Sequence, residues 1–141
     1  MTNLDPPSSE RWFKRVLWAG IIANLALAIP TLLAPERLMA LSGFPPASPL
    51  LWPRFAALLL ILLSLFYMPA GIDVDRYRPV AWLAVASRLA GVVFFLGFQP
   101  HEYRMLGLFD LVFLVPEGIL LTMIASHAYD AVPLRRRGEA R

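Results

Sequence analysis

The chain contains no cysteine among its 141 residues. This absence excludes disulfide bonds, thiolate metal sites, covalently attached haem and cysteine nucleophiles. Charged residues are also scarce, at 16% of the chain against roughly 25% in ordinary soluble domains. Hydrophobic residues, by contrast, make up 58% of the chain. A soluble domain of this length has too little interior to bury so much apolar surface, so the composition favours a membrane environment.

Motifs that carry known chemistry are absent as well. The only histidines, His101 and His127, stand near opposite ends of one apolar stretch, too far apart to ligate a single haem. A metal site would combine His101 with Glu102 alone, which is too sparse a set of ligands. No G-x-S-x-G, H-E-x-x-H, P-loop or dinucleotide-binding glycine pattern occurs. We therefore assign no catalytic residue and no metal ligand, and a non-enzymatic role is favoured.

Four apolar stretches are each close to the ~20 residues that a helix needs to cross the hydrocarbon core of a bilayer. They cover residues 16–34, 50–69, 80–98 and 105–126. Backbone polar groups in lipid must be hydrogen-bonded within their own element, so each stretch is predicted to be a helix. The expected fold is all-α: an integral membrane four-helix up-down bundle.

The connection between the first two stretches is predicted to contain a short interfacial helix that covers one mouth of the bundle. Pro35 stands at its start and Gly43 just after its end, where these residue types are favoured. Its expected apolar face consists of Leu38, Met39 and Leu41. The expected domains are a disordered N-terminus over 1–13, the four-span bundle over 14–128 and a basic tail over 129–141.

The basic residues predict an orientation for these spans. Nine of the 13 Lys and Arg residues lie in the two termini and in the connection between the second and third stretches. Three lie toward the other side, and Arg88 lies inside the third stretch. By the positive-inside rule, both termini are expected to be cytoplasmic. Because the basic residues sit at membrane edges, the net charge of +3 does not indicate a nucleic-acid partner.

Five polar residues fall inside the apolar stretches: Asn24, Arg54, Arg88, Asp110 and Glu117. A charge at the centre of a bilayer costs about 2.5–3.5 kcal/mol on insertion scales, so these side chains are expected to face the bundle interior and pair. Asp110 and Glu117 are almost two turns apart and share one face of their helix.

The expected pairs follow from the depth of each residue in antiparallel neighbours. Folding the third and fourth spans about their connection places Arg88 level with about residue 115, within one turn of Glu117, and Asn24 reaches the same depth. Arg54 is level with about residue 108, so Asp110 is its expected partner. The sequence thus predicts an Arg88–Glu117 pair assisted by Asn24 and an Arg54–Asp110 pair.

These five residues leave alternatives open. Two buried ion pairs can serve only to fix the register and topology of the helices. The same groups can instead form a site for a ligand, a quinone or a proton. A third interpretation is an interface with another membrane subunit, where a charged group meets an external partner.

Several segments resemble the small bacterial four-helix membrane proteins called DoxX-like. The resemblance lies in the four-span layout, in LLAPERLMALSGF between the first two spans, and in WPRFAALLL and SRLAGVVFF. It implies a multi-pass protein of the bacterial cytoplasmic (inner) membrane, and it carries over no catalytic residue. We expect a non-catalytic accessory or structural subunit of a larger respiratory or redox complex, partnered by the lipid bilayer and by other subunits or further copies of the chain. The alternatives are a quinone- or lipid-binding protein and a small proton-coupled transporter, each using the buried Arg/Asp/Glu cluster.

Overall fold

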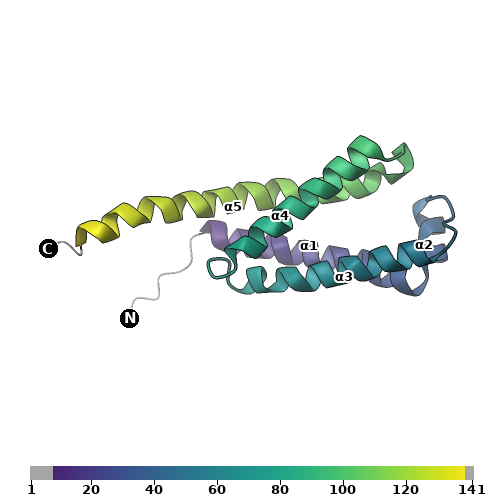
Figure 1. The fold of residues 1–141 in the computed structure, drawn as a ribbon, viewed down its shortest axis with the longest axis horizontal. Coiled ribbons are helices and arrows are strands. Elements are labelled where there is room, and N and C mark those ends of the chain that lie inside the picture. Colours follow the sequence, from purple (N-terminus) through teal and green to yellow (C-terminus); the bar gives the residue numbers. More distant parts are fainter. Residues whose placement is uncertain (1–7, 139–141) are drawn as a thin grey trace.

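The computed structural model describes the backbone of residues 8–138 and the side chains of residues 8–126. Over this range the chain is helical and contains no β-strand. The elements in chain order are α1 (Ser8–Leu33), α2 (Pro35–Ser42), α3 (Leu51–Ile72), α4 (Arg78–Val93), the π-helical turn η1 (Phe94–Phe98), the 3-10 turn η2 (His101–Tyr103) and α5 (Arg104–Gly138) (Figure 1). Four of its helical segments are long and apolar enough to cross a membrane. The helices therefore have the length and composition of a multi-pass membrane protein.

The first helix starts well before the first apolar stretch. It begins at Ser8, so residues 8–13, expected to be disordered, are helical. Ser9 and Phe13 are buried, and they continue the stripe formed by Leu17 and Ile21. Residues spaced by four lie on one face of a helix, so this first turn is held by the same packing as the rest of α1. Residues 1–7 of the expected N-terminal segment lie outside the described residues.

The last helix also extends beyond its apolar stretch. The backbone of α5 continues to Gly138 and takes in most of the expected basic tail, 129–141. The side chains of that tail lie outside the described residues.

The short helix predicted between the first two spans is present as α2. Pro35 is its first residue, and Gly43 follows it with a φ of 71°, the left-handed conformation that glycine adopts without strain. Phe44 N–H donates to the carbonyl of Met39 at 2.9 Å, which closes the end of the helix. Leu38 and Met39 are half-buried, but Leu41 is 86% exposed and is not buried with them.

The core lies at the end of the molecule that carries the turn between α3 and α4. In the bundle, α1 packs against α3 and α5, and α4 packs against α5. The buried core combines apolar side chains of all four long helices and of the α3–α4 turn: Phe13, Leu17, Ile21, Tyr67, Ala70, Val74, Ala81, Ala84, Leu121 and Ile124. Trp18 Nε1 donates to the carbonyl of Gly71 at 3.2 Å and joins α1 to α3.

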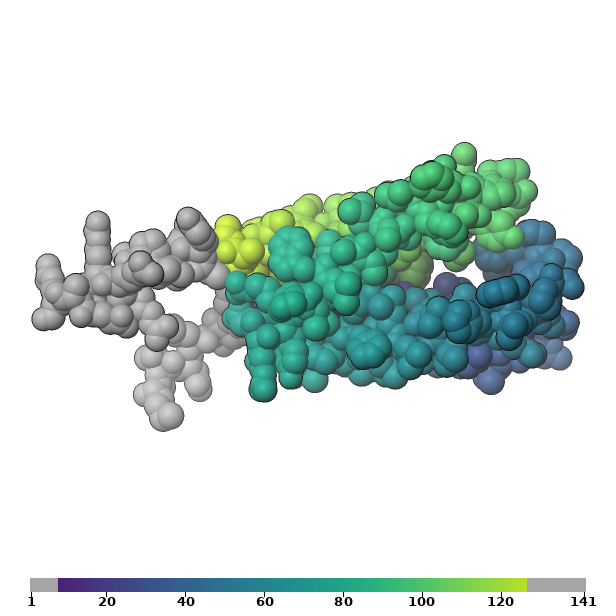
Figure 2. All heavy atoms as spheres, in the orientation of Figure 1, coloured from purple at the N-terminus to yellow at the C-terminus, as the bar shows by residue number. Residues whose placement is uncertain are grey.

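The opposite end is more open. From the α3–α4 turn toward α2, the α4–α5 pair diverges from the α1–α3 pair (Figure 1). The space-filling view shows a hollow between α3 and α4 near that end (Figure 2). The sequence predicted one helix over residues 80–98, but the α-helix ends at Val93 and continues as the wider turn η1 on the diverging side. This divergence positions the candidate site.

Candidate functional site

Arg88 is the centre of a buried polar cluster and is 3% exposed. Its Nε donates to the two carboxylate oxygens of Glu117 at 3.2 and 3.1 Å. Its Nη1 donates to Oδ1 of Asp110 at 3.3 Å. The guanidinium carbon lies 4.7 Å from the centre of the Phe113 ring, an arrangement that favours a cation–π contact. A single cation of α4 therefore bridges two carboxylates on one face of α5.

The structure brings together three of the five residues that the sequence singled out, with Arg88 against Glu117 as expected but with a different partner for Asp110. Arg88 contacts Glu117, and Asp110 pairs with Arg88 as well. Arg54, the expected partner of Asp110, is exposed and forms no ion pair with any residue described. The divergence of the helix pairs explains this difference, because a cavity separates the start of α3 from Asp110 on α5.

Two glycines make room for the cluster. A Cβ atom on Gly20 would collide with Arg88 Nη2 and would lie 3.3 Å from Glu117 Oε1. A Cβ atom on Gly91 would collide with Oδ2 of Asp110. Only glycine permits such close approach of polar side chains to a helix backbone. Sequence reasoning missed Gly20, although its place one turn before Asn24 was an available signal.

Tyr67 and Ser87 form a second polar contact next to the cluster. Ser87 Oγ donates to the carbonyl of Ala84 at 2.9 Å, so the Tyr67 hydroxyl is the donor in the hydrogen bond between Tyr67 and Ser87. The sequence did not mark either residue as functional, because no histidine stands near enough to activate its hydroxyl. Their contact depends on the packing of α3 against α4.

Two polar groups at this depth have no hydrogen-bond partner within the described part of the chain. Arg88 Nη2 is buried against Gly20 and has no acceptor. Asn24 is 3% exposed, and its amide makes no hydrogen bond to the described residues. An unpartnered polar group in an apolar interior costs about 1–3 kcal/mol, so such groups are uncommon and indicate a functional role or a bound molecule.

A small polar cavity of about 80 Å³ adjoins the cluster. Asn24, Tyr67, Ser87, Arg88 and Asp110 supply its polar lining. At roughly 30 Å³ for each water molecule, this volume has room for two or three waters. The cavity thus lies where the unpartnered Asn24 and the Arg88 cluster meet.

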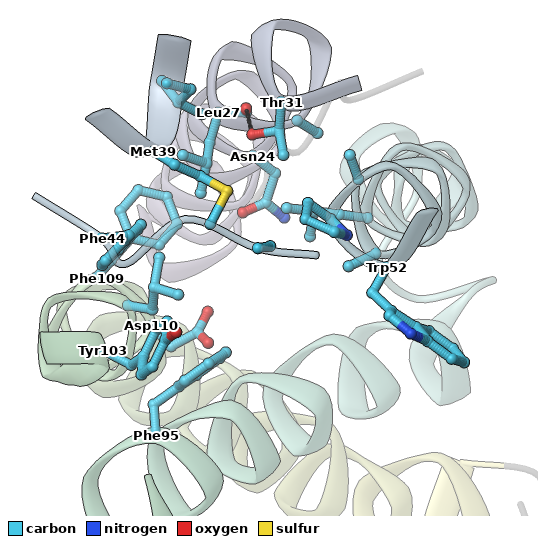
Figure 3. Close-up of a pocket in the computed structure, with 18 residues that line it drawn as sticks. Asn24, Leu27, Thr31, Met39, Phe44, Trp52, Phe95, Tyr103, Phe109 and Asp110 are labelled. Atoms are coloured by element: carbon cyan, nitrogen blue, oxygen red, sulfur yellow. Dashed lines mark hydrogen bonds between the residues drawn. The ribbon is translucent and has the colours of Figure 1, made fainter. Parts of the chain in front are cut away.

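A much larger cavity of about 530 Å³ begins at the same place and extends toward α2. Asn24, Leu60 and Asp110 line both cavities. The side chains of Asn24 and Asp110 point into the large cavity from α1 and α5 (Figure 3). Its other walls are mainly apolar and carry the aromatic rings of Phe44, Phe95, Tyr103 and Phe109, while Trp52 lines the cavity with its ring turned outward (Figure 3). The result is an apolar chamber with one polar end.

The far end of the chamber is covered by α2 and the segment after it. Leu38 and Met39 line the cavity there, and Phe44 stacks on Tyr103 with ring centres 5.3 Å apart. This contact ties the α2 segment to η2. The hollow seen in Figure 2 is instead on the side of the bundle, between α3 and α4.

Among the described residues, no group of three or more histidine, aspartate and glutamate side chains is placed to hold a metal ion. Comparison of the chain with protein-family models, with curated proteins and with solved structures gives no match. The assignment of function therefore depends on the geometry and chemistry of the two cavities and of the cluster beside them.

Proposed function

We propose that the protein is a multi-pass protein of the bacterial cytoplasmic membrane that binds a small amphiphilic molecule between its two helix pairs. The observation that carries this proposal is the 530 Å³ apolar cavity that ends at the unpartnered Asn24 and at Asp110. The amphiphile classes that the sequence analysis considered are quinones and lipids. Each has an apolar body for the chamber and a polar head for its inner end.

Insertion in a membrane is supported by the outer surface of the helices. Large apolar side chains point outward from every long helix, as shown by Ile22 of α1, Phe66 of α3, Leu89 of α4 and Val112 of α5, each more than half exposed. In water such a surface would be an extensive aggregation-prone patch, whereas in a bilayer it contacts lipid. The four spans form an up-down bundle, with α2 in the interface at the non-cytoplasmic side and both termini in the cytoplasm.

The volume and lining of the chamber support a binding role. Small-molecule sites are clefts of roughly 300–1,000 Å³ with mostly apolar walls and a few polar groups that fix orientation. A bundle whose helices only support one another would be packed to the density of a protein interior. The lateral hollow between α3 and α4 gives a route by which a molecule dissolved in the bilayer reaches the chamber.

The polar end supports the same role. Hydrogen bonds within the cluster account for Glu117 and for Nε and Nη1 of Arg88, which lock α4 to α5. They do not account for Asn24, whose amide points into the cavity without a partner among the described residues (Figure 3). A ligand head placed between Asn24 and Asp110 supplies the missing hydrogen bonds.

The experiment is purification from native membranes in a mild detergent, followed by organic extraction and mass spectrometry of bound molecules. In Ala56→Trp, the indole fills the chamber from an exposed lining position on α3, where it does not disturb the core. Ala26→Trp is the matched control, since Ala26 is exposed on α1 and lines neither cavity.

We expect a stoichiometric amphiphile in the wild type and in Ala26→Trp, and its loss in Ala56→Trp. Equal retention by both variants contradicts the proposal. A stoichiometric protein partner, with no bound small molecule, would instead support the accessory-subunit hypothesis.

A further inference from the structure

Building on the proposed function, we infer that the bound amphiphile carries a protonated amine as its head, and that Asp110 is the group that receives it. This inference names the chemical class of the ligand. It rests on the balance of charge at the polar end, on the hydrogen-bonding capacity of the groups that face the cavity, and on the rings beside them.

The charges at the polar end favour a cation. One guanidinium, that of Arg88, faces the two carboxylates of Glu117 and Asp110, so the cluster has one positive charge fewer than its carboxylates. Asp110 is the one charged residue among the described residues that line the large cavity. A negatively charged head in the chamber would therefore meet a carboxylate, and repulsion between like charges in a medium of low dielectric constant is strong.

Arg88 is not placed to attract a negatively charged head into the chamber. Its Nε and Nη1 are occupied by Glu117 and Asp110, and its Nη2 is turned toward Gly20 of α1. The side chain is 3% exposed, so little of it is accessible from the large cavity. Asp110 stands between this cation and the chamber, with 21% of its side chain exposed.

The groups that face the chamber are mainly hydrogen-bond acceptors. Asp110 Oδ1 accepts from Arg88, while Oδ2 has no partner among the described residues. Asn24 contributes a carbonyl oxygen from the opposite wall (Figure 3). An ammonium head has three donors and no acceptor, which fits this arrangement. The carbonyl head of a quinone has only acceptors, so it could accept from the Asn24 amide or the Tyr103 hydroxyl but would leave the Asp110 carboxylate without a donor.

Aromatic rings complete the fit. Phe95 and Tyr103 lie beside Asp110 at the wall of the chamber, and Phe109 precedes it on α5 (Figure 3). Aromatic faces attract ammonium groups, and the attraction is larger where water is excluded. An amine therefore finds a carboxylate, an amide oxygen and ring faces at one end of an apolar chamber.

The test compares three probes with the same apolar chain: dodecylamine, dodecanol and dodecanoate. Each is added to the purified protein in a neutral detergent, and the Tm of the protein is measured against probe concentration. For the wild type we expect dodecylamine to raise Tm by about 5 °C at ten times its Kd, and to act at about tenfold lower concentration than dodecanol. Dodecanoate is expected to have no stabilising effect.

Two variants connect the result to the site. Asp110→Asn keeps the shape of the side chain and an acceptor for Arg88, and should abolish the advantage of dodecylamine over dodecanol. Asn24→Leu, which removes the amide without altering the charges, should reduce the effect of dodecylamine several-fold. Asp75→Asn is the control, because Asp75 is an exposed carboxylate of the α3–α4 turn, paired with Arg78 far from the cavity.

The inference is overturned if dodecanol or dodecanoate equals dodecylamine in the wild type, or if Asp110→Asn retains the preference for the amine. The proposed function stands in either case if the native amphiphile is still lost from Ala56→Trp in the purification experiment. If the three probes instead act equally on the wild type and on Ala56→Trp, the cavity is not the binding site and the proposed function fails with the inference.

Discussion

Replacement of Arg88 by leucine is expected to be the most destabilising single change at the buried cluster. Glu117 is 0% exposed and Asp110 is partly buried, and both carboxylates depend on the one guanidinium. Arg88→Leu leaves two carboxylates on one face of α5 without a counter-charge. Removing one partner of a buried ion pair costs about 3–5 kcal/mol, so we expect a loss of unfolding free energy in this range.

The carboxylate variants are expected to cost less because each leaves Arg88 with a partner. Glu117→Leu removes two hydrogen bonds, but Asp110 remains 3.3 Å from Arg88 Nη1. The expected loss is about 1.5–3 kcal/mol, the range for hydrogen bonds to charged groups. Asp110→Asn preserves the Arg88–Glu117 pair and an amide oxygen for Nη1, and its expected loss is below about 1 kcal/mol.

Combined variants separate the charges from the packing. Arg88→Leu/Glu117→Leu still contains Asp110 without its cation, so it should recover only part of the stability that Arg88→Leu loses. Adding Asp110→Asn removes the last charge, and the triple variant should be close to the wild type, because apolar replacement of a whole buried ion cluster is often neutral. The stabilities are measured as reversible unfolding in mixed micelles of dodecyl maltoside and dodecyl sulfate, followed by tryptophan fluorescence. Trp18, between α1 and α3, reports on the core.

The ranking of these variants by free energy of unfolding tests the electrostatic explanation. If Glu117→Leu is as destabilising as Arg88→Leu, then Asp110 does not share the cation. A triple variant as unstable as Arg88→Leu would show that the loss comes from packing, and the electrostatic explanation would be wrong.

Two further predictions concern the core and the orientation. Gly71→Ala places a Cβ 2.8 Å from Trp18 Nε1, so it should disturb the Trp18–Gly71 hydrogen bond. We expect it to lower the free energy of unfolding by about 1–2 kcal/mol and to shift tryptophan emission. Gly97→Ala is the control: no atom lies within 4 Å of its added Cβ, so it should alter stability by less than about 0.5 kcal/mol. Because the chain has no cysteine, single cysteines introduced by Ser42→Cys and Asp75→Cys test the topology. A membrane-impermeant maleimide added to spheroplasts should label the first and spare the second, and the reverse pattern would contradict the positive-inside assignment.

Much of the architecture could be predicted from the sequence because it depends on local properties. The apolar stretches 16–34, 50–69, 80–98 and 105–126 each coincide with one long helical segment, although α1 begins eight residues before its stretch and α5 continues past its stretch to Gly138. Pro35 and Gly43 marked the ends of α2 correctly, since both act through backbone conformation at their own positions. The start of α1 was misplaced because Ser9 and Phe13 are held by contacts with other helices, which hydropathy does not register.

The candidate site could be predicted only in part. Depth alone brought Arg88 close to Glu117, because both belong to adjacent antiparallel helices joined by a short connection. The predicted partner of Asp110, Arg54, was wrong because the estimate of depth assumed that all four helices stay equally close along their length. The actual bundle diverges toward α2, and Arg54 is left exposed on α3.

The sequence by itself determined the helices, their apolar surfaces and the identity of the few polar residues between them. These properties follow from residue type and spacing along one chain. The tertiary structure decided that one guanidinium pairs with two carboxylates and that Gly20 and Gly91 leave room for these side chains. It also decided that Asn24 faces a chamber walled by aromatic rings. Such features depend on the angle and separation between helices, which are set by side-chain packing over the whole bundle.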